Sequence, residues 1–280
     1  MKLILLFSFF ALSIFSLMRP QWGFQWRQMP KQGVNFLIAL DASKSMLSED
    51  IKPNRLERSK LAIGDLVKKL TGDRVGLLVF TSRAFLQCPL TSDYSGFLTT
   101  LKDVNVNLLP HGGTSLTDAI KESLAVYKDV PGKNKILIVI TDGENHEGDP
   151  LKMAQEAKNA DIAIYCIGIG TREGDLIPFV DREGKKAFLK DKQGNVVKSH
   201  MNEDLLKKIA LMTGGSYIRA NSVDFGLLRI YEEKVSRLEK VELKSKRIKV
   251  YEDRFQIFLS IALVFLIFEF FIDEKLHDAA

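Results

Sequence analysis

The sequence predicts an α/β protein with a doubly wound, mostly parallel sheet. Strand-like and helix-like segments alternate strictly from residue 34 to residue 236. Such alternation is typical of parallel strands joined by crossover helices. The first strand, Phe36–Leu40, has the sequence FLIAL and carries no polar side chain on either face. A strand of this kind is covered by helices on both sides of its sheet.

The remaining elements can be assigned in chain order. Five further strands are predicted: RVGLLVF (74–80), AFLQCPL (84–90, an edge strand), KILIVIT (135–141), IAIYCIGIG (162–170) and SYIRA (216–220). The first helix begins after a capping box formed by Asn54 and Glu57. Further helices are predicted at 94–104, 116–127, 150–159, 202–213 and 223–235. Together these elements make one domain, residues 33–236.

Residues 171–200 interrupt the alternation. Turn signals occur at Glu183-Gly184 and Gln193-Gly194-Asn195, beside short runs such as KAFL and NVVK. We therefore expect a β-hairpin-like insertion after the fifth strand, residues 162–170. Because parallel strands open at the same edge, the insertion should emerge near any site at that edge.

Composition narrows the class of protein. A chain of 280 residues with 46% hydrophobic residues can bury the core of one large domain. The net charge of +5 is modest, and aromatic residues are not interleaved with basic ones, which excludes nucleic acid as the expected partner. Cys88 and Cys166 fall on strands at opposite wings of the sheet, so we expect two unpaired core cysteines.

Apolar segments at both ends predict two membrane anchors. Residues 1–20 contain the apolar run Leu3–Met18, and Trp22 and Trp26 follow it at interface depth. No small-x-small cleavage site follows the run, which favours an uncleaved anchor. Residues 255–272 form a second apolar run, long enough for a transmembrane helix. The basic juxtamembrane segment, 237–254, favours a cytoplasmic domain, whereas Lys2 favours export.

Oxygen-bearing side chains gather at the predicted strand ends. Asp41, Ser43 and Ser45 alternate along the loop after the first strand, so their side chains can converge. Asp142 follows the strand 135–141, and Thr114 precedes the helix between these strands. The two strands are neighbours where the strand order reverses, which is where ligands bind in such sheets. Capping of the next helix is the alternative role for the loop residues, but five oxygen ligands from three loops favour a Mg²⁺-like ion.

Three loops resemble a known family. DASKSM, GGTSL and TDGEN are similar to the loops of the metal-ion-dependent adhesion site in von Willebrand factor A (VWA) domains. RPQWG, SEDIKPNRLERSK, GDRVGLLVF, AFLQCPLTSDY and FLKDKQGNVV extend the resemblance to the membrane-anchored Bacteroides aerotolerance (Bat, BatB-like) proteins. The resemblance implies that the metal residues are Asp41, Ser43, Ser45, Thr114 and Asp142, and that the cofactor is Mg²⁺ or Mn²⁺.

The resemblance also implies a non-enzymatic function. The metal would bind an acidic residue of a partner protein, within a membrane complex of sibling VWA and tetratricopeptide Bat proteins and a MoxR-type AAA+ ATPase. It implies an inner-membrane location with a periplasmic VWA domain. We assign partner binding to five residues around the same edge: Gly113, His111, Glu144, Phe188 and Lys190.

An enzyme of the same sheet type is the alternative. A metal-dependent hydrolase would need a base beside the site, and the candidates are His111 and His146. No G-x-S-x-G elbow and no G-x-x-x-x-G-K-[ST] loop occurs. In GIGTREG, Glu173 stands where a dinucleotide-binding fingerprint requires its third glycine. The sequence therefore favours metal-dependent protein binding over catalysis.

Overall fold

The computed structural model describes residues 2–28, 31–108, 113–130, 134–180, 186–190, 193–221, 224–235, 241–243 and 247–271. Its internal contacts separate two units: residues 32–243, and residues 1–31 together with 244–280. The first contains the predicted α/β domain and the second contains both predicted anchors.

A six-stranded sheet lies at the centre of residues 32–243, in the order β12-β7-β6-β3-β4-β5. Its strands are β3 (Asn35–Asp41), β4 (Arg74–Phe80), β5 (Ala84–Thr91), β6 (Lys135–Thr141), β7 (Ile162–Gly168) and β12 (Tyr217–Arg219). All neighbours are parallel except β4 and β5, where the edge strand runs antiparallel. The predicted fold class is thereby confirmed. The strand order reverses between β3 and β6, so their carboxyl ends form the rim where a ligand is expected.

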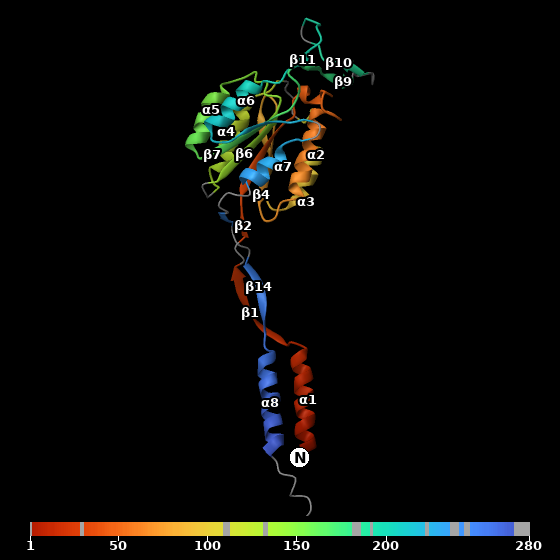
Figure 1. Ribbon diagram of the computed structural model, residues 1–280, viewed down its shortest axis with the longest axis vertical. Coiled ribbons are helices and arrows are strands. Elements are labelled where there is room, and N and C mark those ends of the chain that lie inside the picture. The colour runs from red at the N-terminus through yellow and green to blue at the C-terminus, as the bar shows by residue number, and fades with distance from the viewer. Residues whose placement is uncertain are drawn as a thin grey trace, which may run out of the picture. The chain divides into compact units, whose positions relative to one another are not determined.

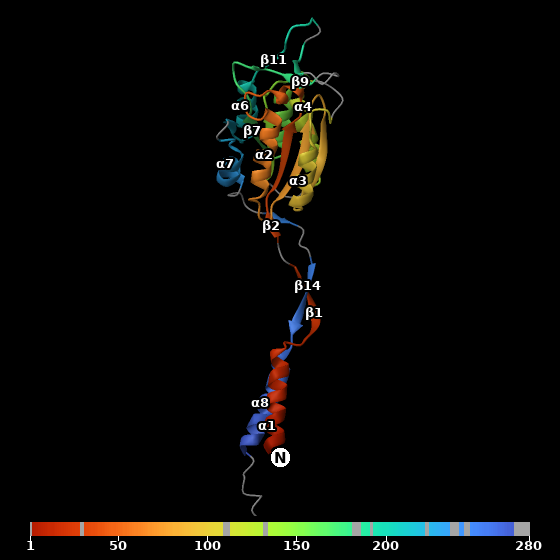
Figure 2. The same ribbon diagram turned by 90° about the vertical axis from the view of Figure 1, so that its right-hand side faces the viewer.

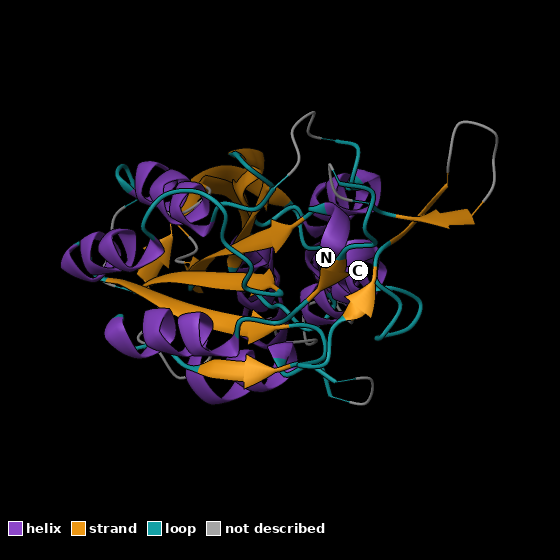
Figure 3. Ribbon diagram, turned by 90° about the horizontal axis from the view of Figure 1, so that it is seen from above, coloured by secondary structure: helices purple, strands orange, loops and turns teal. Residues whose placement is uncertain are grey.

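Helices cover both faces of the sheet (Figures 1, 2 and 3). One face packs against α2 (Arg55–Val67), α3 (Tyr94–Asp103) and α7 (Leu227–Ile230), and the other against α4 (Leu116–Tyr127), α5 (Pro150–Asn159) and α6 (Glu203–Met212). In β3, Phe36 and Ile38 belong to the first core and Leu37 and Ala39 to the second, all fully buried. Two-sided burial explains why the FLIAL run lacks polar residues.

Helix ends agree with the predicted signals except in one place. The Oδ1 atom of Asn54 accepts a hydrogen bond from the Glu57 N–H at 2.8 Å and so caps α2. The last helix was expected from residue 223 but begins at Leu227, and it continues as a π-helical turn, Tyr231–Val235. Gly226 precedes it at φ +80°, where a Cβ atom would collide with Ile218. Residues 222 and 223 lie outside the described residues.

Where the structure describes it, the segment after β7 contains four short strands in two antiparallel pairs. β9 (Pro178–Val180) pairs with β10 (Lys186–Phe188), and β8 (Asp175–Leu176) pairs with β11 (Lys198–Ser199). The hydroxyl of Ser48 donates to the carbonyl of Leu176 at 3.4 Å. The base of the insertion therefore contacts the loop that follows β3.

The other unit consists of two helices and a two-stranded ribbon. Helix α1 (Lys2–Leu17) leads into β1 (Gln21–Gln28), which pairs antiparallel with β14 (Arg247–Asp253), and α8 (Phe255–Phe271) follows. The rings of Phe15 and Phe258 meet edge to face at 4.8 Å between centroids, and the two helices lie side by side (Figure 1). Within the described residues, neither helix combines the length and the apolar character needed to cross a membrane.

Three short elements complete the description. β2 (Lys31–Gly33) pairs with β13 (Val241–Leu243), and a 3₁₀ helix, η1, spans Lys44–Leu47. Of the basic segment predicted at 237–254, residues 237–240 and 244–246 lie outside the described residues.

Candidate metal site at the carboxyl edge of the sheet

The loop after β3 brings three predicted ligands together. Asp41 is the last residue of β3, and its Oδ1 accepts a hydrogen bond from the Ser43 N–H at 2.8 Å. Ser45 lies in η1, and its Oγ is 2.8 Å from the Oγ of Ser43. The three residues are at most 6% exposed. The local turn thus gathers one carboxylate and two hydroxyls at the rim.

Neutral groups surround the carboxylate of Asp41. Its Oδ2 accepts a hydrogen bond from the Thr141 hydroxyl at 2.5 Å, and its Oδ1 accepts the hydrogen bond from the Ser43 amide. Burial, with the nearby negative charge of Asp142, raises the pKa of Asp41 to about 7. The hydrogen bonds oppose this rise without cancelling it. A divalent cation at this position would favour the ionised form that burial disfavours.

The carboxylate of Asp142, in contrast, faces a buried cation. Its Oδ2 accepts hydrogen bonds from Arg55 Nη1 at 3.2 Å and from the Ser199 hydroxyl at 2.9 Å, and its Oδ1 accepts from the Glu144 N–H at 3.1 Å. The side chains of Arg55 and Asp142 are fully buried. Asp142 is therefore fixed by three donors from three separate segments.

Arg55 also makes a two-point ion pair with Asp50. Its Nε and Nη2 donate to the two carboxylate oxygens at 2.9 and 2.8 Å. Burial alone would raise the pKa of Asp50, but the hydrogen bonds and charge of Arg55 hold it below its usual value. Gly170 packs directly on this guanidinium at φ +130°, where a Cβ would lie 2.8 Å from Cζ. Glycine at that position gives the arginine its space.

Thr114 lies on the neighbouring loop and is 2% exposed. Its carbonyl accepts a hydrogen bond from the His146 N–H at 2.9 Å, and Leu116 N–H donates to Asn145 Oδ1 at 3.0 Å. These bonds hold the start of α4 against the loop that carries Asp142. Gly113 precedes Thr114 at φ +105°, and His111 lies outside the described residues.

The donor set and charge of the rim fit a hard divalent cation. Three buried or nearly buried carboxylates (Asp41, Asp50 and Asp142) and one guanidinium (Arg55) carry −3 + 1 = −2 charges when ionised. Two carboxylates and three hydroxyls are oxygen ligands of the kind that Mg²⁺ and Mn²⁺ take. Among the described residues, no three His, Cys, Asp or Glu side chains group as a metal cluster.

Of the residues predicted to bind a partner, Gly113 and Glu144 lie at this rim and Phe188 and Lys190 lie on the insertion. Glu144 is half-buried, its Oε1 accepts from the His200 N–H at 2.9 Å, and burial followed by the charge of Asp142 raises its pKa. Phe188 is 48% exposed and Lys190 is exposed. Two hollows adjoin these residues. One of about 430 Å³ is lined by Glu144, Asn145, His146, His200, Met201 and Asn202, and one of about 370 Å³ by Glu49, Asp175, Leu176, Pro178, Ala187 and Phe188.

Sequence patterns did not reveal the support for Asp142. Arg55 occupies the first position of α2, where a cation is disfavoured by the helix dipole and normally points to solvent. Asp50 and Ser199 lie in segments without periodicity. The one signal in the sequence is SEDIKPNRLERSK, which contains both Asp50 and Arg55 and resembles the family without indicating a role for either residue.

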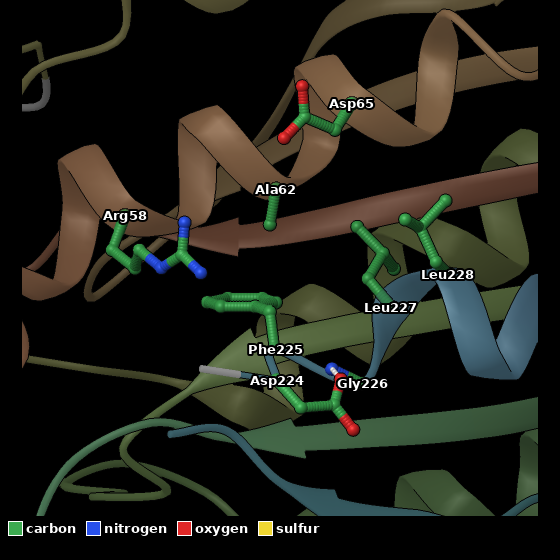
Figure 4. Close-up of a pocket in the computed structure, with 8 residues that line it drawn as sticks. All are labelled: Arg58, Ala62, Asp65, Asp224, Phe225, Gly226, Leu227 and Leu228. Carbon is green, nitrogen blue, oxygen red and sulfur yellow. Dashed lines mark hydrogen bonds between the residues drawn. The ribbon is translucent and has the colours of Figure 1, made fainter. Parts of the chain in front are cut away.

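A separate hollow of about 190 Å³ lies between α2 and the turn before α7 (Figure 4). Arg58 faces the ring of Phe225 across it, and its carboxylates are already paired, Asp65 with Lys68 at 3.0 Å and Asp224 with Arg229 at 3.5 Å. None of the predicted site residues lines this hollow. It is distinct from the rim.

Comparisons with known proteins agree with this architecture. The family model for the von Willebrand factor type A domain matches residues 36–144. The crystal structure of the conserved hypothetical protein BatB from Bacteroides thetaiotaomicron is 36% identical, with a TM-score of 0.69, over 74% of this chain and 100% of that one. An aerotolerance-related membrane protein from Bacteroides fragilis is 34% identical, with a TM-score of 0.68 and the same coverage.

The sequence is also similar to proteins without a solved structure among these matches. An uncharacterized protein of Borreliella burgdorferi is 30% identical over 241 residues, covering 85% of this chain and 68% of the relative. The chain spans 58–61% of the length of the next curated relatives that it matches. The chain belongs to the von Willebrand factor type A domain family. Within that family it is similar to BatB, which confirms the predicted resemblance to the aerotolerance group.

Proposed function

We propose that this protein is a membrane-anchored VWA domain that binds Mg²⁺ or Mn²⁺ and uses the ion to engage an acidic residue of a partner protein. VWA domains mediate protein interactions. The residues around the rim support the more specific proposal that a bound metal makes the contact. Asp41, Ser43, Ser45, Thr114 and Asp142 would hold the metal. Bound there, the ion would supply a Lewis-acidic position that attracts a carboxylate.

The observation that carries the proposal is the charge of the rim. The pair formed by Arg55 and Asp50 is electrically neutral, so Asp41 and Asp142 leave −2 for a divalent ion to balance. The remaining predicted ligands are neutral hydroxyls. Apart from the half-buried carboxylate of Glu144, whose pKa is raised by burial and by Asp142, the loaded site would then have no excess negative charge to repel an incoming carboxylate. Attraction of that carboxylate would require no catalytic group.

Calorimetric titration of residues 32–243 with Mg²⁺ and Mn²⁺ tests the metal site. Asp41→Ala should abolish binding while the fold is kept, because Asp41 lies at the end of its strand. Asp65→Ala is the matched control, since it removes a surface carboxylate of α2 that pairs with Lys68. Equal affinity in the wild type and Asp41→Ala would show that the site is wrongly assigned.

The partners proposed are sibling VWA and tetratricopeptide Bat proteins, with a MoxR-type AAA+ ATPase. Phe188 and Lys190, with Gly113 and Glu144 at the rim, would contact them beside the metal. The hollow next to Phe188 contains apolar Leu176 and Pro178, which suits an apolar side chain near the partner's acid. Lys190 would add an attractive charge for an acidic surface.

Affinity capture from detergent extracts of native membranes tests partner binding. Capture should be lost in EDTA and in Asp41→Ala, and weakened in Phe188→Ser. Phe85→Ser is the matched control, because Phe85 is a similarly exposed phenylalanine on edge strand β5. Capture that persists unchanged in EDTA would contradict the metal-bridged mechanism.

We further propose that α1 and α8 anchor the chain in the bacterial inner membrane with the VWA domain in the periplasm. Support comes from the apolar surfaces of both helices and from the membrane protein of Bacteroides fragilis that the domain resembles. Protease added to spheroplasts should degrade the domain. Full protection would instead favour a cytoplasmic domain, as the basic residues of 237–254 suggest.

A further inference from the structure

The ends of both apolar helices and the base of the ribbon form one local structure. Residues 18–20 are all that separate α1 from β1, and Arg254 alone separates β14 from α8. The N–H of Arg254 donates to the carbonyl of Pro20 at 3.0 Å, and the Ser16 hydroxyl donates to the carbonyl of Phe255 at 3.0 Å. The first residues of the ribbon are therefore fixed next to the ends of both helices.

Trp22, next to these helix ends, packs against α8. Its ring meets the ring of Phe258 edge to face at 5.7 Å between centroids, beside the contact that Phe15 makes with the same ring. Trp22 nevertheless remains 45% exposed. An indole with an apolar body and one N–H donor prefers the boundary between hydrocarbon and water.

Further aromatic and basic side chains surround the ribbon at its base. Phe24 and Tyr251 are cross-strand partners that are 48% and 56% exposed, and the Nζ of Lys249 lies 4.7 Å from the centre of the Phe24 ring. The side chain of Arg19 is 73% exposed. We call Arg19, Trp22, Phe24, Lys249 and Tyr251 the collar. Rings of this kind mixed with cations suit a layer that holds both apolar chains and anionic phosphates.

The ribbon argues against a deeper location for the collar, and the short helix argues against a purely aqueous one. The outer edges of a two-stranded ribbon leave backbone N–H and C=O groups that hydrocarbon cannot satisfy. Helix α1 has 16 residues, about 24 Å at about 1.5 Å per residue, which is shorter than a hydrocarbon core of about 30 Å. Apolar rings directly beyond the helix ends would extend the anchor's apolar length into the interfacial layer.

We propose that the collar binds the headgroup layer of an anionic phospholipid bilayer and sets the depth of the anchor. This inference rests on the proposed membrane anchoring. Trp22 would then lie at the hydrocarbon boundary. Trp26 follows four residues later in β1, about 13 Å farther along the strand from the helix ends.

The two tryptophans are the only ones in the chain, so each can be observed alone. Trp26→Phe leaves Trp22 as the fluorophore, and Trp22→Phe leaves Trp26. The full-length variants are reconstituted into phosphatidylglycerol–phosphatidylcholine vesicles whose acyl chains are brominated near the headgroup. We expect blue-shifted emission and quenching several-fold stronger for Trp22 than for Trp26. Equal quenching of the two, or quenching of Trp26 alone, would overturn the inference.

Flotation of the same vesicles distinguishes failure of the collar from failure of the proposed membrane anchoring. A wild-type chain that does not float with lipid would refute the membrane anchoring, and the inference with it. A chain that floats but whose Trp22 is not quenched would refute the collar alone. Arg19→Gln with Lys249→Gln should reduce the dependence of Trp22 quenching on the phosphatidylglycerol content of the vesicles. Undiminished dependence would contradict a role for the two cations.

Discussion

Asp41 and Asp142 follow neighbouring strands and meet at one rim, yet only Asp142 faces a buried cation. Asp41 is surrounded by a hydroxyl and an amide, and its pKa is raised to about 7. Asp142 receives hydrogen bonds from Arg55, Ser199 and the Glu144 amide. One carboxylate is stabilised by the fold and the other is left to a ligand.

The difference separates two tasks that a metal site must perform. A carboxylate held by an internal ion pair keeps its orientation whether or not a metal binds. A carboxylate in neutral surroundings disfavours its own charge, and a metal relieves that cost on binding. We therefore expect Asp142 to contribute mainly to the structure of the rim, and Asp41 to couple metal binding to pH.

Loss of the buried cation should have the largest effect. Arg55→Met leaves the carboxylates of Asp142 and Asp50 buried without their partner, and we expect a loss of about 3–5 kcal/mol in the free energy of unfolding. Urea unfolding of residues 32–243 measures it. Lys68→Met is the control, because its pair with Asp65 is exposed and should contribute less than about 1 kcal/mol. Similar losses in the two variants would contradict the assigned role of Arg55.

The pH dependence of stability should come from Asp41. Its pKa rises from 3.8 to about 7 on folding, so between these values the folded protein retains a proton that the unfolded chain has lost. The free energy of unfolding should therefore fall as pH rises from about 4 to about 7, by up to roughly 4 kcal/mol from this group.

The test compares urea unfolding of the wild type and Asp41→Asn from pH 4.5 to pH 8 in EDTA. The burial of Glu144 acts in the same direction, so the difference between the two proteins isolates Asp41. That difference should change with pH across this window and become constant above it. A constant difference throughout would show that Asp41 does not titrate there.

Removing one charge from each carboxylate should give opposite results at pH 8 without metal. Asp41→Asn should raise the free energy of unfolding by about 1–3 kcal/mol, because it removes a disfavoured buried charge and keeps part of its hydrogen bonding. Asp142→Asn should lower it by a similar amount, because Arg55 loses its ionised acceptor. Both should lose Mg²⁺ binding in calorimetry. Effects of the same sign on stability would contradict the comparison.

The smallest effect should follow from the hydroxyl that supports Asp142. Ser199→Ala removes the donor to Asp142 and an acceptor for Arg55, which should cost about 1–2 kcal/mol. Ser123→Ala is the matched control, since Ser123 is equally buried and bonds only a carbonyl of its own helix at 2.6 Å. A larger loss in the control would show that Ser199 is not part of the support.

Local patterns in the sequence predicted the sheet and the position of the rim. Apolar runs such as Phe36–Leu40 identify strands covered on both faces, because the pattern of apolar residues that marks a buried strand is complete within a few residues. Asp41, Ser43 and Ser45 share one loop, so their convergence follows from their spacing. The predicted start of the last helix was wrong, because Gly226 adopts φ +80° and breaks the helical conformation there. A Cβ at this position would collide with Ile218, a contact that no local pattern contains.

Tertiary structure alone decided which carboxylate has a cation. Arg55 lies 87 residues from Asp142 in sequence, and Ser199 lies 57 residues from it. A repeating pattern of apolar residues indicates which side chains of a helix or strand are buried. A single buried arginine adds nothing to such a pattern, so the sequence does not reveal it. Its partners are brought together when the loop before α2, the loop after β6 and the segment after β7 pack together, because burying the guanidinium requires the oxygens of Asp50, Asp142 and Ser199.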